Sequence, residues 1–342
     1  MRFKDIQGNE ALTAALRQMV DSGRIPHALL LHEDDGGGAF PVVLAFLQYL
    51  YCRNRADGDA CGACPSCNKV AKLIHPDIHF VFPVAGADKP VSDTFAPVFR
   101  ELVLSQPYFF ENELYAALGF EGKQGLISVG EAKSVLDKLS LSGVEGGYRS
   151  VVMYLPEKMN QPAANSLLKM IEEPPEMTLF LLITHAPEKV LTTISSRCLP
   201  MRVMPLPRAV AAEVHPAQSA DRTVCLDLFS DLLEALLKRD LLTALETGEA
   251  IASLENREKQ KSFCKFATEC LRRIFLLQQG LPELAGIPDD EKAFVGRMAE
   301  RCRKSFPRGA MNAIDRAAML LERNVSQKIL FTDLVNRLYM LI

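Results

Sequence analysis

The order of apolar and polar positions near the start of the chain predicts a helix, a strand, a turn and a second helix. Apolar residues spaced three and four positions apart predict a helix over 9–20, and the run HALLLH at 27–32 predicts a buried strand. A polar, glycine-rich turn follows at 33–38, and the apolar segment 42–51 predicts a helix. Strand, glycine turn and helix in this order are the layout of a phosphate-binding loop.

The middle of the chain alternates strands with helices. Apolar runs predict strands over 78–82, 151–155 and 179–184, and helical spacing predicts helices over 130–140 and 163–173. Strands separated by helices indicate a parallel sheet with helices on its faces. The fold class is therefore α/β over this part of the chain.

The last third of the chain has no strand signal. Residues 226–342 have amphipathic helical spacing and predict an all-α domain. Residues 206–225 have few large apolar side chains and predict a linker. The first domain then covers 1–205, with an insertion at about 84–125 whose signals are weak and to which the sequence assigns no role.

Composition and charge exclude several classes of protein. Apolar residues make up 48% and charged residues 24%, which excludes a disordered, collagen-like or coiled-coil chain. With 39 basic and 42 acidic side chains the net charge is −3, so any DNA contact must be local or shared with partners. No apolar run is long enough to cross a membrane and no secretory signal follows Met1, so we expect a cytoplasmic protein.

Four of the nine cysteines are clustered. Cys52, Cys61, Cys64 and Cys67 follow the pattern C-x8-C-x2-C-x2-C, and two residues between thiolates let a tight turn direct both sulfurs at one metal ion. Four soft thiolates favour tetrahedral zinc, and four protein ligands leave no position for a catalytic water. We predict a structural zinc site, with free or iron–sulfur-binding cysteines as the alternative.

The other cysteines and two nearby histidines are interpreted as structural. His75 and His79 follow the cluster, and we expect core or surface histidines there, not metal ligands. The remaining cysteines should behave as small core hydrophobes; they are Cys198, Cys225, Cys264, Cys270 and Cys302.

The turn after the first strand lacks the chemical groups of a nucleotide loop, G-x-x-x-x-G-K-[ST]. Glu33 replaces the first glycine, Ala39 replaces the lysine, and Phe40 replaces the hydroxyl that would hold Mg²⁺. Together with Asp34 and Asp35, Glu33 places negative charge where a triphosphate would lie. We expect no ATP here; the alternative is that the turn never was a nucleotide loop. Its glycines are Gly36, Gly37 and Gly38.

A second part of a hydrolytic site is also missing. ATPases place one or two carboxylates at the end of another strand to hold Mg²⁺ and orient water. Here Tyr154 and Leu155 end the strand at 151–155, and Glu157 is offset by two residues.

The segment 163–198, AANSLLKMIEEPPEMTLFLLITHAPEKVLTTISSRC, resembles bacterial clamp-loader subunits of the AAA+ class. The pattern N-x-L-L-K-x-x-E-E-P-P, an apolar strand and S-R-C carry the resemblance, together with the cysteine spacing, the HALLL strand and the tripeptide His75-Pro76-Asp77. It implies an AAA+ parallel-sheet domain with a zinc module at about 52–75 and a helical collar domain. It also implies gamma/tau-type ATPase subunits and a delta subunit as partners, with the sliding clamp and primer-template DNA reached through the complex.

The resemblance implies a role for Arg197. In the family, the arginine of S-R-C enters the ATP site of the neighbouring subunit, where it stabilises charge on the γ-phosphate. Ser196 and Cys198 flank it and should set the turn. The alternative is an arginine that caps a helix or pairs with a surface acid.

Two features depart from the family pattern or carry no clear role. Relatives have a helical lid between the two domains, and only about 206–226 is available for it here, so the resemblance implies that 206–225 is a linker or a reduced lid. Six basic side chains lie within 292–308 with one acid, Glu300, and a solvated helix face is the favoured interpretation over a phosphate contact. An active ATPase with a divergent loop and a zinc-dependent nucleic-acid-binding module remain alternatives to a non-catalytic subunit.

Overall fold

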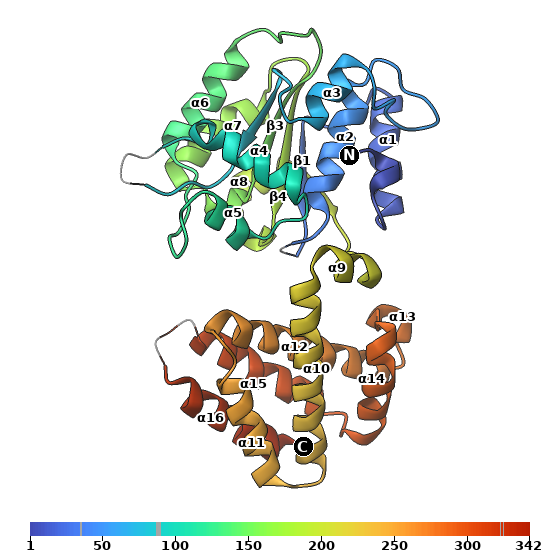
Figure 1. Ribbon diagram of the computed structural model, residues 1–342, viewed down its shortest axis with the longest axis vertical. Helices are drawn as coiled ribbons and strands as arrows, with labels where there is room; N and C mark the ends of the chain where they lie inside the picture. Colours follow the sequence, from blue (N-terminus) through green and yellow to red (C-terminus); the bar gives the residue numbers. More distant parts are fainter. Residues whose placement is uncertain (35, 87–89, 322, 324) are drawn as a thin grey trace. The chain divides into compact units, whose positions relative to one another are not determined.

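The computed structural model describes residues 1–34, 36–86, 90–321, 323 and 325–342, so Asp35 and part of the 84–125 insertion lie outside the description. The chain forms two compact units, Met1–Pro207 and Arg208–Ile342 (Figure 1). Each unit has its own apolar core, and each is described by itself.

The first unit is built on a five-stranded parallel sheet with the strand order β2-β3-β4-β1-β5. Because all pairs are parallel, the carboxyl ends of the strands lie along one edge of the sheet, where open α/β sheets bind ligands. The strands are β1 (Ala28–His32), β2 (Ile78–Val81), β3 (Arg149–Tyr154), β4 (Thr178–Thr184) and β5 (Leu199–Arg202).

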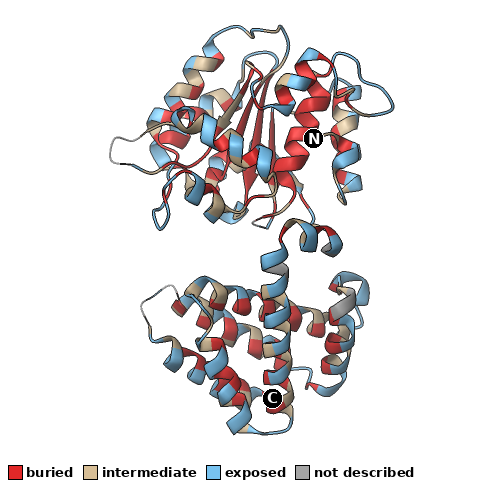
Figure 2. Cartoon of the chain, viewed as in Figure 1, coloured by how far each residue is buried: buried red, intermediate tan, exposed pale blue. Residues whose placement is uncertain are grey.

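Helices cover both faces of the sheet, and the period-two alternation of the strands sends side chains into two cores. Leu29 and Leu31 of β1 pack in one core with α1 and α2, whereas Leu30 packs in the other with α6 and α7. Figure 2 shows the strands buried between these layers. The helices of this unit are α1 (Glu10–Asp21), α2 (Ala39–Tyr51), α3 (Pro65–Ala71), α4 (Ala96–Ser105), α5 (Glu111–Ala117), α6 (Val129–Ser140), α7 (Gln161–Glu172) and α8 (Thr192–Ser195).

The predicted strands and helices of this unit are present, with small shifts at their ends. The second predicted helix begins earlier than expected, at Ala39, directly after the glycine turn. Strand β5 was not predicted, because it is short, contains Pro200 and has mostly exposed side chains. The expected fold class, a parallel α/β domain followed by a helical domain, is confirmed.

The 84–125 insertion forms α4 and α5 and packs on the same core as α2. Phe99, Phe109 and Leu114 are buried in that core. The insertion therefore covers the side of the sheet on which the glycine turn and α2 lie.

In the second unit, every regular element among the described residues is a helix. Its core takes apolar residues from α10, α11, α12, α14, α15 and α16. The segment 206–225, where a linker or reduced lid was expected, is helical over most of its length. The helices are α9 (Arg208–Val214), α10 (Pro216–Leu237), α11 (Leu241–Ala252), α12 (Arg257–Gln278), α13 (Pro282–Ala285), α14 (Asp289–Arg301), α15 (Phe306–Leu321) and α16 (Gln327–Leu341).

The second unit also buries a charge. The Glu291 carboxylate is fully buried, at 2.8 Å from the Arg222 guanidinium and 2.5 Å from that of Arg273. Among the described residues, no helix has both the length and the apolar character needed to cross a membrane.

Candidate functional site

The glycine turn lies at the carboxyl end of β1, between the ends of β4 and β5. The Glu33 side chain, directly after β1, is turned inward and is only 9% exposed. Its Oε2 accepts a hydrogen bond of 2.7 Å from the backbone N–H of Ala39, the first residue of α2. A carboxylate therefore lies at the amino-terminal end of this helix, where the helix dipole and free N–H groups attract anions.

The turn fits closely around this carboxylate. A Cβ added at Gly37 would collide with Glu33 Oε2, so only glycine leaves room for it. On the other side, His185 Nε2 lies 3.8 Å from Glu33 Oε1 and 3.4 Å from the Tyr154 hydroxyl.

Aromatic residues fill the space next to the turn. The Phe40 ring is 5.4 Å from the Phe109 ring and 6.2 Å from the Tyr154 ring, both edge to face. Phe110 lies so close to Gly36 that a Cβ there would collide with its ring. The position of the expected hydroxyl and the end of β3 are therefore packed against the 84–125 insertion.

Glu157 has a structural contact at the edge of this site. Its carboxylate accepts hydrogen bonds from the Thr184 hydroxyl at 2.7 Å and from the His185 N–H at 3.0 Å. The carboxylate thus ties the segment after β3 to the end of β4.

The four clustered cysteines come together at the ends of α2 and α3. Their Sγ atoms all lie within 4.8 Å of one another, and Cys61 Sγ is 3.9 Å from Cys67 Sγ. A tetrahedral ion with bonds of about 2.3 Å holds sulfurs about 3.8 Å apart, so the arrangement fits one. The backbone N–H groups of Cys61 and Cys64 lie 3.3 Å from Cys52 Sγ and Cys61 Sγ, in the direction that stabilises thiolates.

Thiol ionisation within the cluster is uneven. Backbone N–H groups of Ala63 and Cys64 lower the pKa of the Cys61 thiol to about 6. Burial raises the pKa of Cys67. A cation at the centre would favour the thiolate form of all four, so the cluster can hold a metal ion. His75 and His79 lie outside the cluster, and the other five cysteines are buried as expected.

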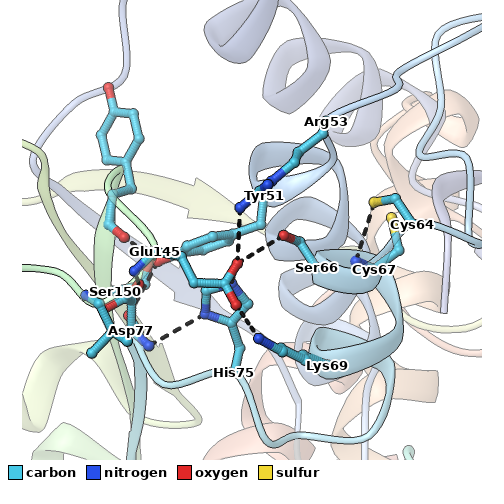
Figure 3. A network of polar contacts seen from close by, with 12 residues as sticks. Tyr51, Arg53, Cys64, Ser66, Cys67, Lys69, His75, Asp77, Glu145 and Ser150 are labelled. Atoms are coloured by element: carbon cyan, nitrogen blue, oxygen red, sulfur yellow. Dashed lines mark hydrogen bonds and ion pairs between the residues drawn. The ribbon is translucent and has the colours of Figure 1, made fainter.

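A network of polar contacts joins the cysteine module to the loop before β3 (Figure 3). The Glu145 carboxylate accepts a hydrogen bond of 3.0 Å from Ser66 and pairs with Lys69, both on α3, and lies 3.5 Å from His75 Nε2. The Asp77 carboxylate accepts hydrogen bonds from the N–H groups of Val144 and Glu145, at 2.7 and 2.9 Å.

The pKa values of His75 and Glu145 in this network are both lowered. Burial lowers the pKa of His75, which favours its neutral form. The hydrogen bond from Lys69 lowers the pKa of Glu145, which favours its ionised form. Sequence reasoning singled out His75-Pro76-Asp77 as a resemblance, but Glu145 carries no sequence signal because its partners are far away in the chain.

Arg197 lies in the short link between α8 and β5. Its guanidinium is 2.5 Å from the Glu172 carboxylate at the end of α7, and it donates hydrogen bonds to the Thr193 carbonyl at 2.9 Å and the Ser196 hydroxyl at 3.2 Å. The side chain remains 38% exposed, whereas Cys198 beside it is buried. The guanidinium is thus held by contacts with α7 and α8, and the side chain is still partly open to solvent.

The basic run at 292–308 extends from α14 through the link that contains Arg303 and Lys304 to the start of α15. Arg301 donates to both carboxylate oxygens of Glu234 at 2.8 Å. The side chains of Arg297, Arg303 and Arg308 are exposed, as on a solvated face.

The parallel sheet and the strand–turn–helix layout define a domain of the phosphate-loop type. Residues 8–207 match the sequence profile of the family described as DNA polymerase III, delta subunit. This stretch is more than half of the chain, and the chain belongs to this family.

Curated relatives agree with this assignment. The chain is 32% identical over 190 residues to the DNA polymerase III subunit delta' of Yersinia pestis and 31% identical over 186 residues to that of Pseudomonas aeruginosa. Each alignment covers about 55% of this chain and 45% of the relative. It is also 29% identical over 212 residues, 61% of its length, to the DNA polymerase III subunit gamma/tau of Mycobacterium bovis, of which 30% is covered. The matched part thus spans about half the length, or less, of these relatives.

Proposed function

We propose that this chain is a delta-prime-type subunit of the DNA polymerase III clamp loader that does not hydrolyse ATP itself and supplies Arg197 in trans to a neighbouring ATPase subunit. In this role it helps the complex to open the sliding clamp and place it on primer-template DNA. Its direct partners are gamma/tau-type ATPase subunits and the delta subunit.

The observation that carries the proposal is a phosphate loop without catalytic groups in a chain that keeps an accessible arginine. Ala39 offers no cation to the phosphates, and Phe40 offers no hydroxyl to Mg²⁺. Phe40 is also packed in an aromatic cluster with Phe109 and Tyr154, where nucleotide chemistry would require polar groups.

The exposed Arg197 supports the second half of the proposal. A guanidinium is always charged and its planar fork suits phosphate oxygens. An exposed ion pair such as Arg197–Glu172 contributes at most about 1 kcal/mol, so a neighbour's triphosphate can compete for the guanidinium.

The cysteine cluster supports a structural zinc ion. Cys52, Cys61, Cys64 and Cys67 would hold it through four sulfurs, leaving no position for a substrate. Zinc would fix the end of α2 against α3, and through Ser66 and Lys69 the loop that contains Glu145.

Nucleotide binding by the isolated full-length chain tests the absence of ATPase chemistry. We expect no saturable signal in a titration with a fluorescent ATP analogue and Mg²⁺, under conditions in which a gamma/tau-type subunit binds. Saturable binding would favour the alternative suggested by the gamma/tau relative, an active ATPase with a divergent loop.

Reconstitution tests the role in the complex. A loader assembled from gamma/tau-type and delta subunits should place clamps on primed DNA faster with this chain than without it. Equal rates would contradict the proposal. Salt-dependent DNA binding by the isolated chain would instead favour a zinc-dependent nucleic-acid-binding module, which its net charge of −3 disfavours.

A further inference from the structure

We propose that Glu33 is an internal ligand of the phosphate-binding position: its carboxylate occupies the anion site at the start of α2, holds the turn closed and keeps polyphosphates out. This inference deepens the proposed function, on which it rests, by assigning the exclusion of nucleotide to one side chain.

The Glu33 carboxylate binds a backbone N–H group at the start of α2. In a working loop, backbone N–H groups at the start of the helix bind phosphate oxygens. Here the N–H of Ala39, at the beginning of α2, donates to Glu33 Oε2 at 2.7 Å. One of the groups that a phosphate would use is therefore already bound to a carboxylate oxygen from the same loop.

The backbone of the turn lies close to this carboxylate oxygen. Any side chain at Gly37 would displace the carboxylate, and any at Gly36 would collide with Phe110. Gly36 also has a φ of 75°, which glycine adopts without strain. Gly37 thus leaves room for the chain's own carboxylate, and Gly36 leaves room for the Phe110 ring.

The Glu33 carboxylate is buried next to the turn. Glu33 is 9% exposed, whereas its neighbour Asp34 is exposed. A buried carboxylate requires partners, and the Ala39 N–H at the start of α2 and His185, 3.8 Å away, provide them. An incoming phosphate would have to expel this carboxylate and would meet its negative charge.

The test compares full-length Glu33→Ala, Glu33→Gln and the matched control Asp34→Ala, each in the presence and absence of inorganic pyrophosphate. Loss of a side-chain partner at a helix start should lower the Tm of Glu33→Ala by about 2–4 °C, with a smaller fall for Glu33→Gln, which keeps an acceptor oxygen. Pyrophosphate should raise the Tm of Glu33→Ala but leave that of the wild type and Asp34→Ala unchanged.

Three results would overturn the inference. They are a Glu33→Ala variant as stable as the wild type, a destabilised variant that pyrophosphate does not stabilise, and a wild type that gains as much Tm as the variant. If Glu33→Ala does not fold, the Tm of Glu33→Gln decides, because it must fall below that of the wild type when the charge is lost. Stabilisation of the wild type by ATP and Mg²⁺ would contradict the proposed function, whereas the variant results concern Glu33 alone.

Discussion

The guanidinium of Arg197 and the carboxylate of Glu172 form an ion pair of 2.5 Å that joins the end of α7 to the link before β5. Both side chains are about two-fifths exposed, so water screens the pair and its contribution to stability is small. The pair can hold the guanidinium in a defined place without preventing its release to a stronger anion.

Replacing Arg197 should lower the activity of the neighbouring ATPase subunit and should not change the stability of this chain. We expect Arg197→Ala to leave Tm and complex assembly nearly unchanged and to lower ATP turnover of the assembled loader, because an arginine supplied in trans accelerates γ-phosphate cleavage by about 10³–10⁵ at the site that it serves. Steady-state ATPase assays with clamp and primed DNA measure this. Glu172→Gln is the matched control, and its turnover should equal or exceed that of the wild type. Unchanged turnover in Arg197→Ala would remove the trans-acting role.

The cysteine cluster should bind about one zinc ion per chain. Cys61→Ser should reduce the zinc content and lower the Tm of the Met1–Pro207 unit; Cys61 is only half-buried, so the substitution itself disturbs the packing little. Elemental analysis and thermal melts followed by circular dichroism provide the measurements. Cys225→Ser, outside the cluster, should keep its zinc. Full zinc content in Cys61→Ser would mean that the ligand set is wrong.

Glu131, in the first turn of α6, should make the stability of the first unit depend on pH. Burial raises the pKa of its carboxyl group, which accepts hydrogen bonds from the N–H and the hydroxyl of Ser92. A carboxyl whose pKa is higher in the folded state binds more protons there, so its contribution to stability is full below the unfolded pKa and declines as the pH rises through the folded pKa.

Glu131→Gln keeps an acceptor for Ser92 and removes this ionisation. The Tm of the variant relative to the wild type should therefore rise as the pH is increased from about 4.5 towards neutrality. Asp137→Asn, an exposed site on the same helix, is the control and should show a smaller change. A difference between Glu131→Gln and wild type that stays constant with pH would contradict the prediction.

Glu291 should be essential for the stability of the helical unit. Its removal leaves the Arg222 and Arg273 guanidinium groups with Glu269, at 3.5 and 3.7 Å, as their remaining acidic partner. Breaking a buried pair costs about 3–5 kcal/mol, and Glu269 should keep the loss at the lower end of this range. We expect that loss for Glu291→Ala in urea unfolding followed by circular dichroism, since the chain has no tryptophan to report by fluorescence. The exposed Glu283→Ala should be nearly neutral. A loss below about 1 kcal/mol in Glu291→Ala would contradict the prediction and would mean that Glu269 compensates both arginines.

The sequence predicted the central strands because burial on both faces requires continuous apolar runs, as in the HALLLH and LFLLIT segments. It did not predict β5, whose exposed residues and Pro200 give no such run. The sequence also predicted that Ala39 and Phe40 replace the lysine and the hydroxyl of a nucleotide loop, because the motif specifies a chemical group for each position.

The inward orientation of the Glu33 side chain could not be predicted from the residues of the glycine turn. Whether a side chain in a glycine turn faces water or a helix end depends on backbone angles that the residue types do not specify. The packing of Phe109 on Phe40 and the contacts of Glu145 with α3 join residues far apart in the chain, and local periodicity contains no information about such pairs.

Glu145 also determines whether the cysteine segment can be separated from its host. The Glu145 carboxylate, outside the segment, accepts a hydrogen bond from Ser66 and pairs with Lys69 and Arg53, all within it. Asp77 in turn accepts a hydrogen bond from the backbone N–H of Glu145 and so holds its loop in place. A graft of residues 52–72 onto another scaffold would lack its acidic counterpart, and a deletion would leave Glu145 without its cations. The segment is therefore an integral part of this domain and not a separable module.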